Sequence, residues 1–324
     1  MGPEPARVAP EEEWLGYFAS LCNWGRWGPD DTRGTLNLVT PEKVVAACAT
    51  VREGRTVSCA RVIEFGERPS ALESRIPPLH FFSWTGVRAP EHGGSGSIDW
   101  LGIPLHGLYV THVDAHAHAF WDGQMYNGRP ASAVSAERGA REGSLQPIEA
   151  GVVTRGVLLD VARALGVDAL PAGFAVGAVE LEQTAAHQGV AVEPGDMLMV
   201  RTGYGKQRAA GREVALVAPG ADPERDAPHL PGLGVAALPW LHEHDVALVG
   251  TDTGTDARPS PYSFNAPVHV VAMCAMGMWV VDNLDLEALR TACDELGRWS
   301  FLAAIAPLRL KNATGSPINP IAVF

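Results

Sequence analysis

The chain has 324 residues, of which 46% are hydrophobic and 19% charged, and this is ample apolar material for a sizeable core. Its formal net charge of −12 argues against a nucleic-acid partner, because phosphate binding needs basic patches. The longest uncharged stretch near the C-terminus, residues 259–281, contains prolines and a histidine, which makes it a poor membrane span.

Residues 1–13 are rich in proline and glutamate and contain no apolar run, so we expect a disordered N-terminal arm and no signal peptide. The five cysteines are scattered and lack any CxxC spacing, which is typical of reduced thiols. We therefore expect a cytoplasmic protein with an arm over residues 1–13 and one domain over residues 14–324.

The first third of the chain predicts short elements separated by turn-forming residues. A helix begins within Glu13–Phe18, and Thr40 followed by Pro41 predicts the start of a second helix. β-Branched residues over Thr56–Ile63 predict a strand. The stretch Ser70–Trp100 is rich in glycine, proline and serine with little periodicity, so we expect a long surface loop of the kind that often carries function.

The remainder of the chain alternates strands with helices. Asp196–Thr202 is almost continuously apolar, which is typical of a strand that is buried on both faces. The alternation favours an α/β fold, a single domain with a mixed β-sheet flanked by helices. The expected strands are Gly151–Leu159, Asp196–Thr202, Val246–Gly250 and Met278–Val281, and the expected helices are Glu180–Gly189, Leu238–His244 and Asp285–Leu296.

The segment richest in reactive side chains is Leu105–Ala119, where polar residues recur with a period of two: His112, Asp114, His116 and His118. In an extended strand these four side chains project from one face. Imidazole and carboxylate groups on one face suit a divalent ion such as Zn²⁺ or Mn²⁺. A single histidine on a strand is usually a packed, hydrogen-bonded residue, but four such groups leave several buried polar atoms to satisfy at once. The pattern therefore predicts a metal or catalytic site.

This segment resembles the motif of the cyclase family, which includes bacterial kynurenine formamidases and isatin hydrolases. The family pattern is His-x-Gly-Thr-His-x-Asp-x-x-x-His, and the chain matches it from Thr111 to His118. The run 122–128 looks like the longer branch of the family, and the resemblance extends over nearly the whole chain. Further matching runs are 23–31, 34–38, 194–196, 201–203, 231–233, 282–284 and 314–317.

The resemblance implies a metal-dependent enzyme with the swivelling β/α-type fold of that family and an extended N-terminal arm. His112 and Asp114 match metal ligands, and His118 matches the general acid/base. The family completes its metal site with a later histidine and a glutamate, and His269 and Asp282 occupy those places here. The alternatives are a packed histidine at position 269 and a helix cap at position 282.

Two positions of the motif differ from the family. Leu108 stands where the family has its first histidine, and Val110 stands where it has glycine. The loss of one ligand favours one ion over two. His116 is the preferred substitute because it lies on the favoured strand face, whereas His106 has the wrong spacing.

Other polar and aromatic residues are weaker candidates. Asp252 and Asp256 follow a buried strand, and we expect a role in a turn rather than in the site. Tryptophans beside the loops are candidates for an aromatic wall against a planar substrate. They are Trp24, Trp27, Trp84, Trp100 and Trp121.

Together these observations predict hydrolysis of an amide, lactam or ester carbonyl in a small, cyclic or aromatic molecule. A bound cation lowers the pKa of water from about 15.7 towards 7, and His118 moves the protons. No Gly-x-Ser-x-Gly run occurs, which disfavours a serine hydrolase.

Two other functions stay open: a ring-forming cyclase or lyase of secondary metabolism, and a degenerate, metal-free protein that binds a small molecule. The sequence identifies no substrate-binding residue. The resemblance also implies a homodimer or homotetramer in which the N-terminal segment reaches a neighbour.

Overall fold

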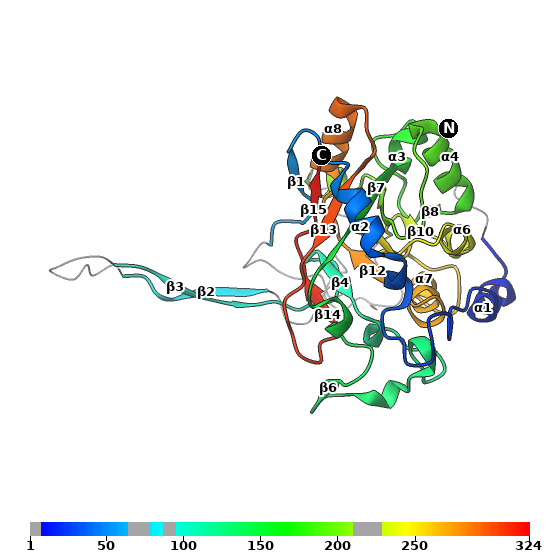
Figure 1. Ribbon diagram of the computed structural model, residues 1–324, viewed down its shortest axis with the longest axis horizontal. Coiled ribbons are helices and arrows are strands. Elements are labelled where there is room, and N and C mark those ends of the chain that lie inside the picture. Colours follow the sequence, from blue (N-terminus) through cyan, green and yellow to red (C-terminus); the bar gives the residue numbers. More distant parts are fainter. Residues whose placement is uncertain (1–7, 64–77, 87–94, 210–228) are drawn as a thin grey trace.

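The computed structural model describes residues 8–63, 78–86, 95–209 and 229–324 (Figure 1). Four neighbouring strands in the middle of its main sheet run parallel: β7 (Val152–Asp160), β9 (Met197–Arg201), β11 (Leu248–Thr251) and β12 (Trp279–Asp282). Antiparallel strands flank them on both sides, so the sheet is mixed, as predicted. Nine of the described strands form this sheet, in the order β1-β15-β13-β7-β9-β11-β12-β4-β14.

The flanking strands are shorter and come from distant parts of the chain. They are β1 (Thr56–Ser58), β4 (His112–Asp114), β13 (Ser300–Ile305), β14 (Gly315–Pro317) and β15 (Ile321–Val323). Three two-stranded pairs lie outside the main sheet. They are β2 (Leu79–Trp84) with β3 (Ile98–Gly102), β5 (Val134–Ser135) with β6 (Gly139–Ala140), and β8 (Ala175–Val176) with β10 (Gly232–Leu233).

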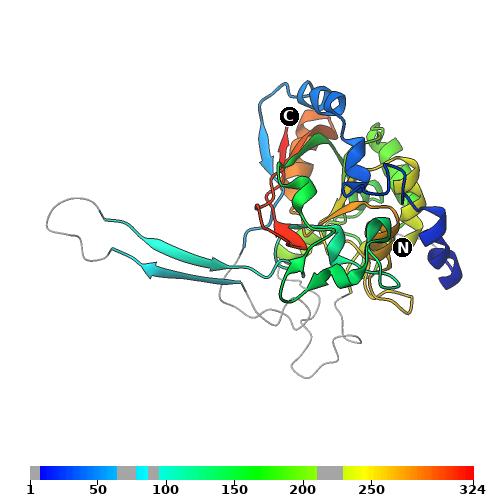
Figure 2. The ribbon, with the colours of Figure 1, turned by 60° about the horizontal axis from the view of Figure 1, so that its bottom comes forward.

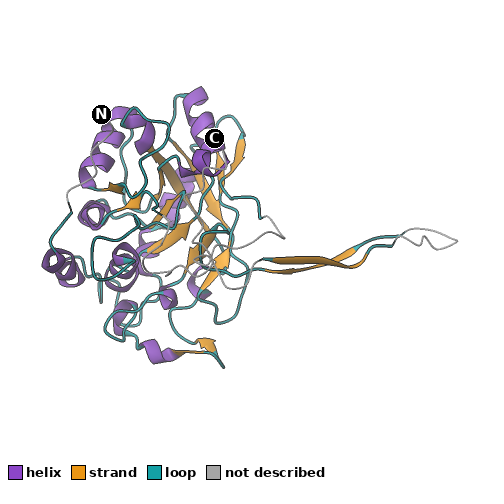
Figure 3. Ribbon diagram, turned by 180° about the vertical axis from the view of Figure 1, so that it is seen from behind, coloured by secondary structure: helices purple, strands orange, loops and turns teal. Residues whose placement is uncertain are grey.

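The central strands are largely apolar because both faces of the sheet are covered (Figures 2 and 3). Successive residues alternate between two separate clusters, so that Leu198 packs in one cluster and Met199 in the other. The first cluster includes side chains of α4 (Ala178–Gln188) and α6 (Leu238–Glu243), and the second includes side chains of α8 (Glu287–Leu296).

The remaining helices are short: α1 (Glu11–Ser20), α2 (Pro41–Cys48), α3 (Val161–Ala164), α5 (Tyr204–Ala209) and α7 (Pro267–Val270). The hydroxyl of Thr40 accepts a hydrogen bond from the backbone N–H of Lys43, which confirms the predicted start of α2. None of the helices in the described residues is long and apolar enough to cross a membrane.

The N-terminal arm is shorter than the sequence predicted. Because α1 begins at Glu11, residues 11–13 are helical and do not belong to a disordered arm. Residues 1–7 of the expected arm lie outside the described part of the chain.

Strands β2 and β3 form a hairpin that projects from the rest of the domain (Figures 1 and 2). The sequence predicted a long surface loop over Ser70–Trp100, and this prediction is wrong where the structure describes strands. Residues 70–77 and 87–94 lie outside the described residues. Phe81 pairs with Trp100, and their rings stack with centroids 5.0 Å apart. Apolar residues occupy both faces of the hairpin, which removed the period-two signal from the sequence. Its large apolar side chains are 44% to 59% exposed: Leu79, Phe81, Phe82, Trp84, Ile98, Trp100 and Leu101.

Candidate metal and catalytic site

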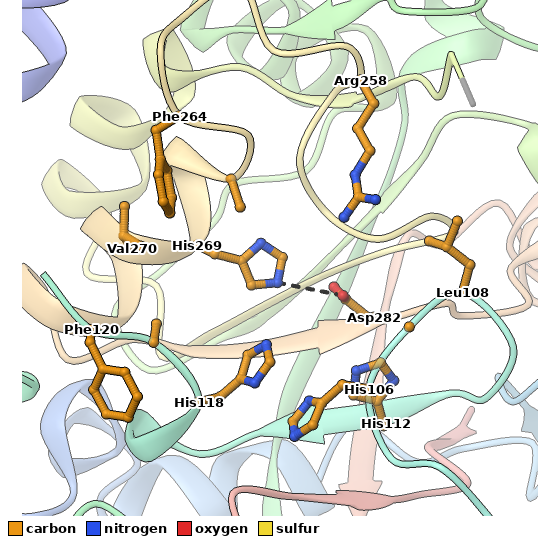
Figure 4. A pocket seen from close by; sticks show the side chains of 13 residues that line it. His106, Leu108, His112, His118, Phe120, Arg258, Phe264, His269, Val270 and Asp282 are labelled. Atoms are coloured by element: carbon orange, nitrogen blue, oxygen red, sulfur yellow. Dashed lines mark ion pairs between the residues drawn. The ribbon is translucent and has the colours of Figure 1, made fainter. Parts of the chain in front are cut away.

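The candidate site lies at the carboxyl end of β12, beside the antiparallel strand β4. The register places His112 of β4 opposite Asp282 of β12. The carboxyl ends of central parallel strands are where α/β sheets usually bind ligands. Figure 4 shows the pocket there, with a volume of about 410 Å³. Four imidazoles line it, those of His106, His112, His118 and His269.

The carboxylate of Asp114 is completely buried among these imidazoles. Its Oδ1 lies 2.8 Å from His106 Nδ1 and 3.5 Å from His112 Nε2. Its Oδ2 lies 3.6 Å from His269 Nε2 and 4.0 Å from His118 Nε2. None of these contacts has hydrogen-bond geometry, so neither oxygen has a hydrogen-bond donor among the described residues. A buried carboxylate in this state is stabilised by positive charge beside it, which protonated imidazoles or a bound cation can supply.

Opposing effects set the pKa of Asp114. Burial alone would raise the pKa of this carboxyl group. Interactions with the imidazoles of His112 and His118, with further contributions from His106 and His269, instead hold the pKa well below its usual value. Asp114 is therefore ionised at neutral pH and offers a negative charge to a cation.

The backbone immediately before β4 fixes the ring of His112. Its Nδ1–H donates to the carbonyl oxygen of Val110 at 2.8 Å, because a carbonyl oxygen can only accept. The Nε2 lone pair is then free and lies on the side of Asp114. Metal-binding histidines commonly have this arrangement, in which a backbone acceptor orients the ring.

His269, on α7, lies between two carboxylates. Its Nδ1 is 2.5 Å from Asp256 Oδ2, and its Nε2 is 3.4 Å from Asp282 Oδ2. Asp256 also accepts a hydrogen bond from the backbone N–H of Val268 at 2.8 Å, which ties it to α7. Burial lowers the pKa of His269, but Asp282, Asp114 and Asp256 together raise it well above the usual value. These carboxylates favour the protonated form of His269, and a cation bound at Nε2 would take the place of the proton on that nitrogen.

Asp282 is the last residue of β12 and caps no helix, since α8 begins at Glu287. Its Oδ1 accepts a hydrogen bond from the hydroxyl of Thr255 at 2.6 Å. Burial would raise the pKa of Asp282, but the charge of His269 lowers it. The helix-cap alternative for Asp282 is therefore wrong, and the structure brings Asp282 together with His269.

His106 belongs to the cluster, although its spacing argued against it. Besides its approach to Asp114, its Nε2 lies 2.9 Å from the hydroxyl oxygen of Thr314. The spacing argument assumed an extended strand, but β4 begins only at His112 and the chain turns at Gly107, whose φ is +119°. His106 thus brings an imidazole to the cluster, whereas the side chain of Leu108 cannot act as a ligand.

His116 does not belong to the cluster. The prediction that His116 replaces the ligand missing at position 108 is therefore wrong. Strand β4 ends at Asp114, and residues His116–His118 form a 3₁₀ turn, η2. His116 Nε2 donates to the carbonyl oxygen of Gly277 at 3.0 Å, and its ring packs against Tyr126 and Trp279. Burial lowers the pKa of His116 to about 4, so it stays neutral at pH 7.

The same turn returns His118 to the pocket, where its side chain is 33% exposed. Its ring stacks on that of His106. Burial lowers the pKa of His118 to about 4; Asp114 acts in the opposite direction, and His106 adds to the lowering. A neutral, partly exposed imidazole at the pocket can accept a proton.

Two groups of three donors share Asp114, and within each group the ligand atoms lie within 4.8 Å of one another. Imidazole nitrogens and carboxylate oxygens are donors that Zn²⁺ and Mn²⁺ accept. The donor set and the bare carboxylate of Asp114 therefore fit a divalent cation. The groups are His106, His112 and Asp114, and Asp114, His269 and Asp282.

Sequence reasoning missed two features of the site. Asp256 was expected in a turn, but it holds His269; its place after a buried strand was the available signal. The expected tryptophan wall is also wrong for the described part of the pocket, because the rings that line it are those of Phe120 and Phe264.

Comparisons with known proteins place these features in context. The family model named Cyclase matches residues 73–257. A crystal structure described as a novel cyclase is similar over nearly the whole chain, with 31% sequence identity and a TM-score of 0.82. The match covers 98% of this chain and 100% of that chain. No curated protein matches.

Two isatin hydrolase structures share the fold at lower identity. Isatin hydrolase A from Labrenzia aggregata, bound to benzyl benzoate, is 21% identical with a TM-score of 0.57, covering 87% of this chain and 97% of its own. An isatin hydrolase bound to the product analogue thioisatinate is 18% identical with a TM-score of 0.56, covering 87% of this chain and 98% of its own.

Proposed function

The chain belongs to the cyclase family, and from this premise we propose that it is a metal-dependent hydrolase of an amide, lactam or ester carbonyl. The observation that carries the proposal is the fully buried carboxylate of Asp114, which has no hydrogen-bond donor although four imidazoles surround it. The isatin hydrolases of the same fold support a small, cyclic or aromatic substrate, since isatin is an aromatic lactam.

We assign one divalent ion, Zn²⁺ or Mn²⁺, to the donor group Asp114, His269 and Asp282. We add His112 as a fourth donor, because its Nε2 lies 3.5 Å from Asp114 Oδ1. When bound, such an ion polarises a carbonyl and makes an attacking water more acidic. The role of the protein is to hold the donors ready. Val110 orients His112, Asp256 orients His269, and Thr255 orients Asp282.

His118 is the proposed general acid/base. Because it is neutral near pH 7, it can take the proton of the water that attacks the carbonyl carbon. It can then return this proton to the leaving nitrogen or oxygen as the bond to the carbonyl carbon breaks. His118 lies outside both groups of donors, so proton transfer leaves the donors in place.

The donor group Asp114, His269 and Asp282 does not involve position 108, which weakens the argument for a degenerate, metal-free binding protein. The ring-forming alternative is separated from hydrolysis by the fate of water oxygen. We expect the protein, with its metal content measured, to open isatin or a related aromatic lactam in ¹⁸O-labelled water and to place one labelled oxygen in the carboxylate product. Turnover of lactams, esters and amides that incorporates no label would contradict hydrolysis and favour a cyclase or lyase.

We also propose that the chain forms a homodimer through the β2–β3 hairpin. A two-stranded hairpin is marginally stable alone, and this one exposes large apolar side chains on both strands. Exposed apolar surface of this kind is typical of an interface. A second copy of the chain would cover this apolar surface, because each copy would bring the same apolar hairpin to the contact.

A further inference from the structure

Arg258 is a cation in the site pocket that has no ion-pair partner among the described residues. The side chain of Arg258 lines the pocket and is half-buried. Its Nε is buried without a hydrogen bond, and among the described residues its guanidinium group forms no ion pair. A buried N–H of a charged group without an acceptor is unfavourable, because the hydration that this N–H loses is not replaced.

The backbone holds Arg258 firmly in this place. Its N–H donates to the carbonyl oxygen of Leu230 at 2.8 Å, and its carbonyl oxygen accepts from the N–H of Leu230 at 2.9 Å. It follows Asp256 by two residues, so one loop supplies both the residue that orients His269 and the unpaired guanidinium.

The guanidinium lies beside the donor cluster. A Cβ atom placed on Gly254 would be 3.8 Å from both Arg258 Nη2 and Asp282 Oδ2. The two groups thus flank the same small space without forming an ion pair. Figure 4 shows Arg258 pointing into the pocket from the side that bears Leu108 and Asp282.

The opposite side of the pocket is apolar. Phe120, Phe264 and Val270 line it, and Figure 4 shows them across from Arg258, with His269 between. A molecule in the pocket would therefore have apolar side chains around its ring, and its polar group would face the donor cluster and the guanidinium group together.

We propose that Arg258 is the anion-binding residue of the site, and that the ligand class is an aromatic carboxylate, formed when the carbonyl of the substrate is cleaved. This rests on the proposed function, because hydrolysis of a lactam or ester leaves a carboxylate at the cleaved carbon. The ring packs against Phe120 and Phe264, and the carboxylate accepts charge-assisted hydrogen bonds from the guanidinium fork.

The test is calorimetric binding of benzoate and of its neutral counterpart benzamide to protein of measured metal content. We expect wild-type protein to bind benzoate more tightly than benzamide. We expect Arg258→Met to weaken benzoate binding about tenfold or more and to leave benzamide binding unchanged. Arg258→Lys keeps the positive charge but lacks the planar guanidinium group. Its affinity for benzoate should therefore lie between those of wild type and Arg258→Met. The matched control is Arg309→Met, because Arg309 is exposed and lies outside the pocket.

Equal benzoate binding by wild type and Arg258→Met overturns the proposal, as does wild-type protein that fails to bind benzoate at millimolar concentration. If Arg258→Met does not fold, the preference of wild type for benzoate over benzamide and the Arg258→Lys result decide. The outcome is separable from the hydrolase proposal. Arg258-dependent benzoate binding without any lactam or ester turnover would leave Arg258 as the anion-binding residue, but would remove the hydrolase and the origin of the carboxylate as its product. Turnover of lactams or esters together with benzoate binding that does not depend on Arg258 would support the hydrolase and overturn the role of Arg258.

Discussion

The imidazole of His106 stacks on the imidazole of His118, with centroids 3.7 Å apart and ring planes 9° from parallel. Two stacked imidazoles cannot both carry a proton without repulsion. His106 approaches Asp114 and Thr314 through its two nitrogens, so its position is fixed. This neighbour helps to keep His118 unprotonated at neutral pH.

Replacing His118 tests its proposed role in proton transfer. We expect His118→Ala to lower kcat about a hundredfold or more while metal content, measured by elemental analysis, stays at the wild-type level. The reason is that His118 belongs to neither donor group. His187→Ala serves as the control, because His187 is exposed on α4. Loss of the metal in His118→Ala, or full activity, would contradict the assignment.

Asp256 should act on the metal through His269. We expect Asp256→Asn to weaken metal affinity about ten- to a hundredfold, because Asn is a poorer acceptor for the Nδ1–H of His269. Competition with a chromophoric chelator measures this. Asp168→Asn is the control, since the Asp168 side chain is 90% exposed. Equal affinities of wild type and Asp256→Asn would show that Asp256 does not hold His269 for a ligand.

The number of ions can be read from two histidine variants. With one ion in the proposed place, His269→Ala should lose the ion, whereas His106→Ala should keep the wild-type stoichiometry. The ratio of metal to protein after gel filtration gives the answer. Two ions per wild-type chain, with one lost in His106→Ala, would contradict the single ion and assign the second to His106, His112 and Asp114.

The buried His116 predicts a pH dependence of stability. Its pKa is about 4 in the folded protein because of burial, and about 6.5 when unfolded. The unfolded state therefore binds the extra proton first, so stability is full above pH 6.5 and falls as the pH drops towards 4. The loss is at most about 3 kcal/mol.

Urea unfolding of chelator-treated protein at pH 7.5 and pH 5 checks this prediction. We expect His116→Gln to lose less stability between the two pH values than wild type does, even if it is less stable at both. The exposed His187→Gln should behave like wild type. An equal loss in His116→Gln would show that His116 does not carry this acid sensitivity.

The hairpin predicts the oligomeric state. We expect light scattering to find a dimer for wild type and a monomer for the double variant Phe81→Ser with Trp100→Ser, because these stacked, exposed rings are central to the apolar surface. Val45→Ser removes an apolar side chain that is 69% exposed on α2 and should stay dimeric. A monomeric wild type, or a dimeric double variant, would contradict the proposal.

The sequence predicted the centre of the fold better than its periphery. Buried parallel strands are long apolar runs between turns, and the predicted strands over residues 151–159, 196–202, 246–250 and 278–281 are all present. Strands β13, β14 and β15 were missed, because β14 and β15 have only three residues each and β13 follows α8 closely. The hairpin was missed because its two faces are equally apolar.

At the site, strand periodicity held only within β4. It placed His112 and Asp114 together, whereas His118, which it also predicted on this face, reaches the pocket from the turn η2. The family resemblance brought in His269 and Asp282. Periodicity failed where the backbone leaves the strand, at Gly107 before it and at Ala115 after it. Local spacing cannot show these turns. For this reason His106, which was expected outside the site, lies in it, and His116, which was expected in the site, lies outside it.

The donors of the site come from segments that are far apart in the sequence and adjacent only after folding. In an unfolded chain Asp114 would be solvated, and nothing would bring it near Asp282 or His269. An ion that binds this arrangement binds the native state alone, and so it adds to the free energy of unfolding by mass action. The supply of metal in the surroundings would then govern how long the folded protein lasts as well as how fast it works.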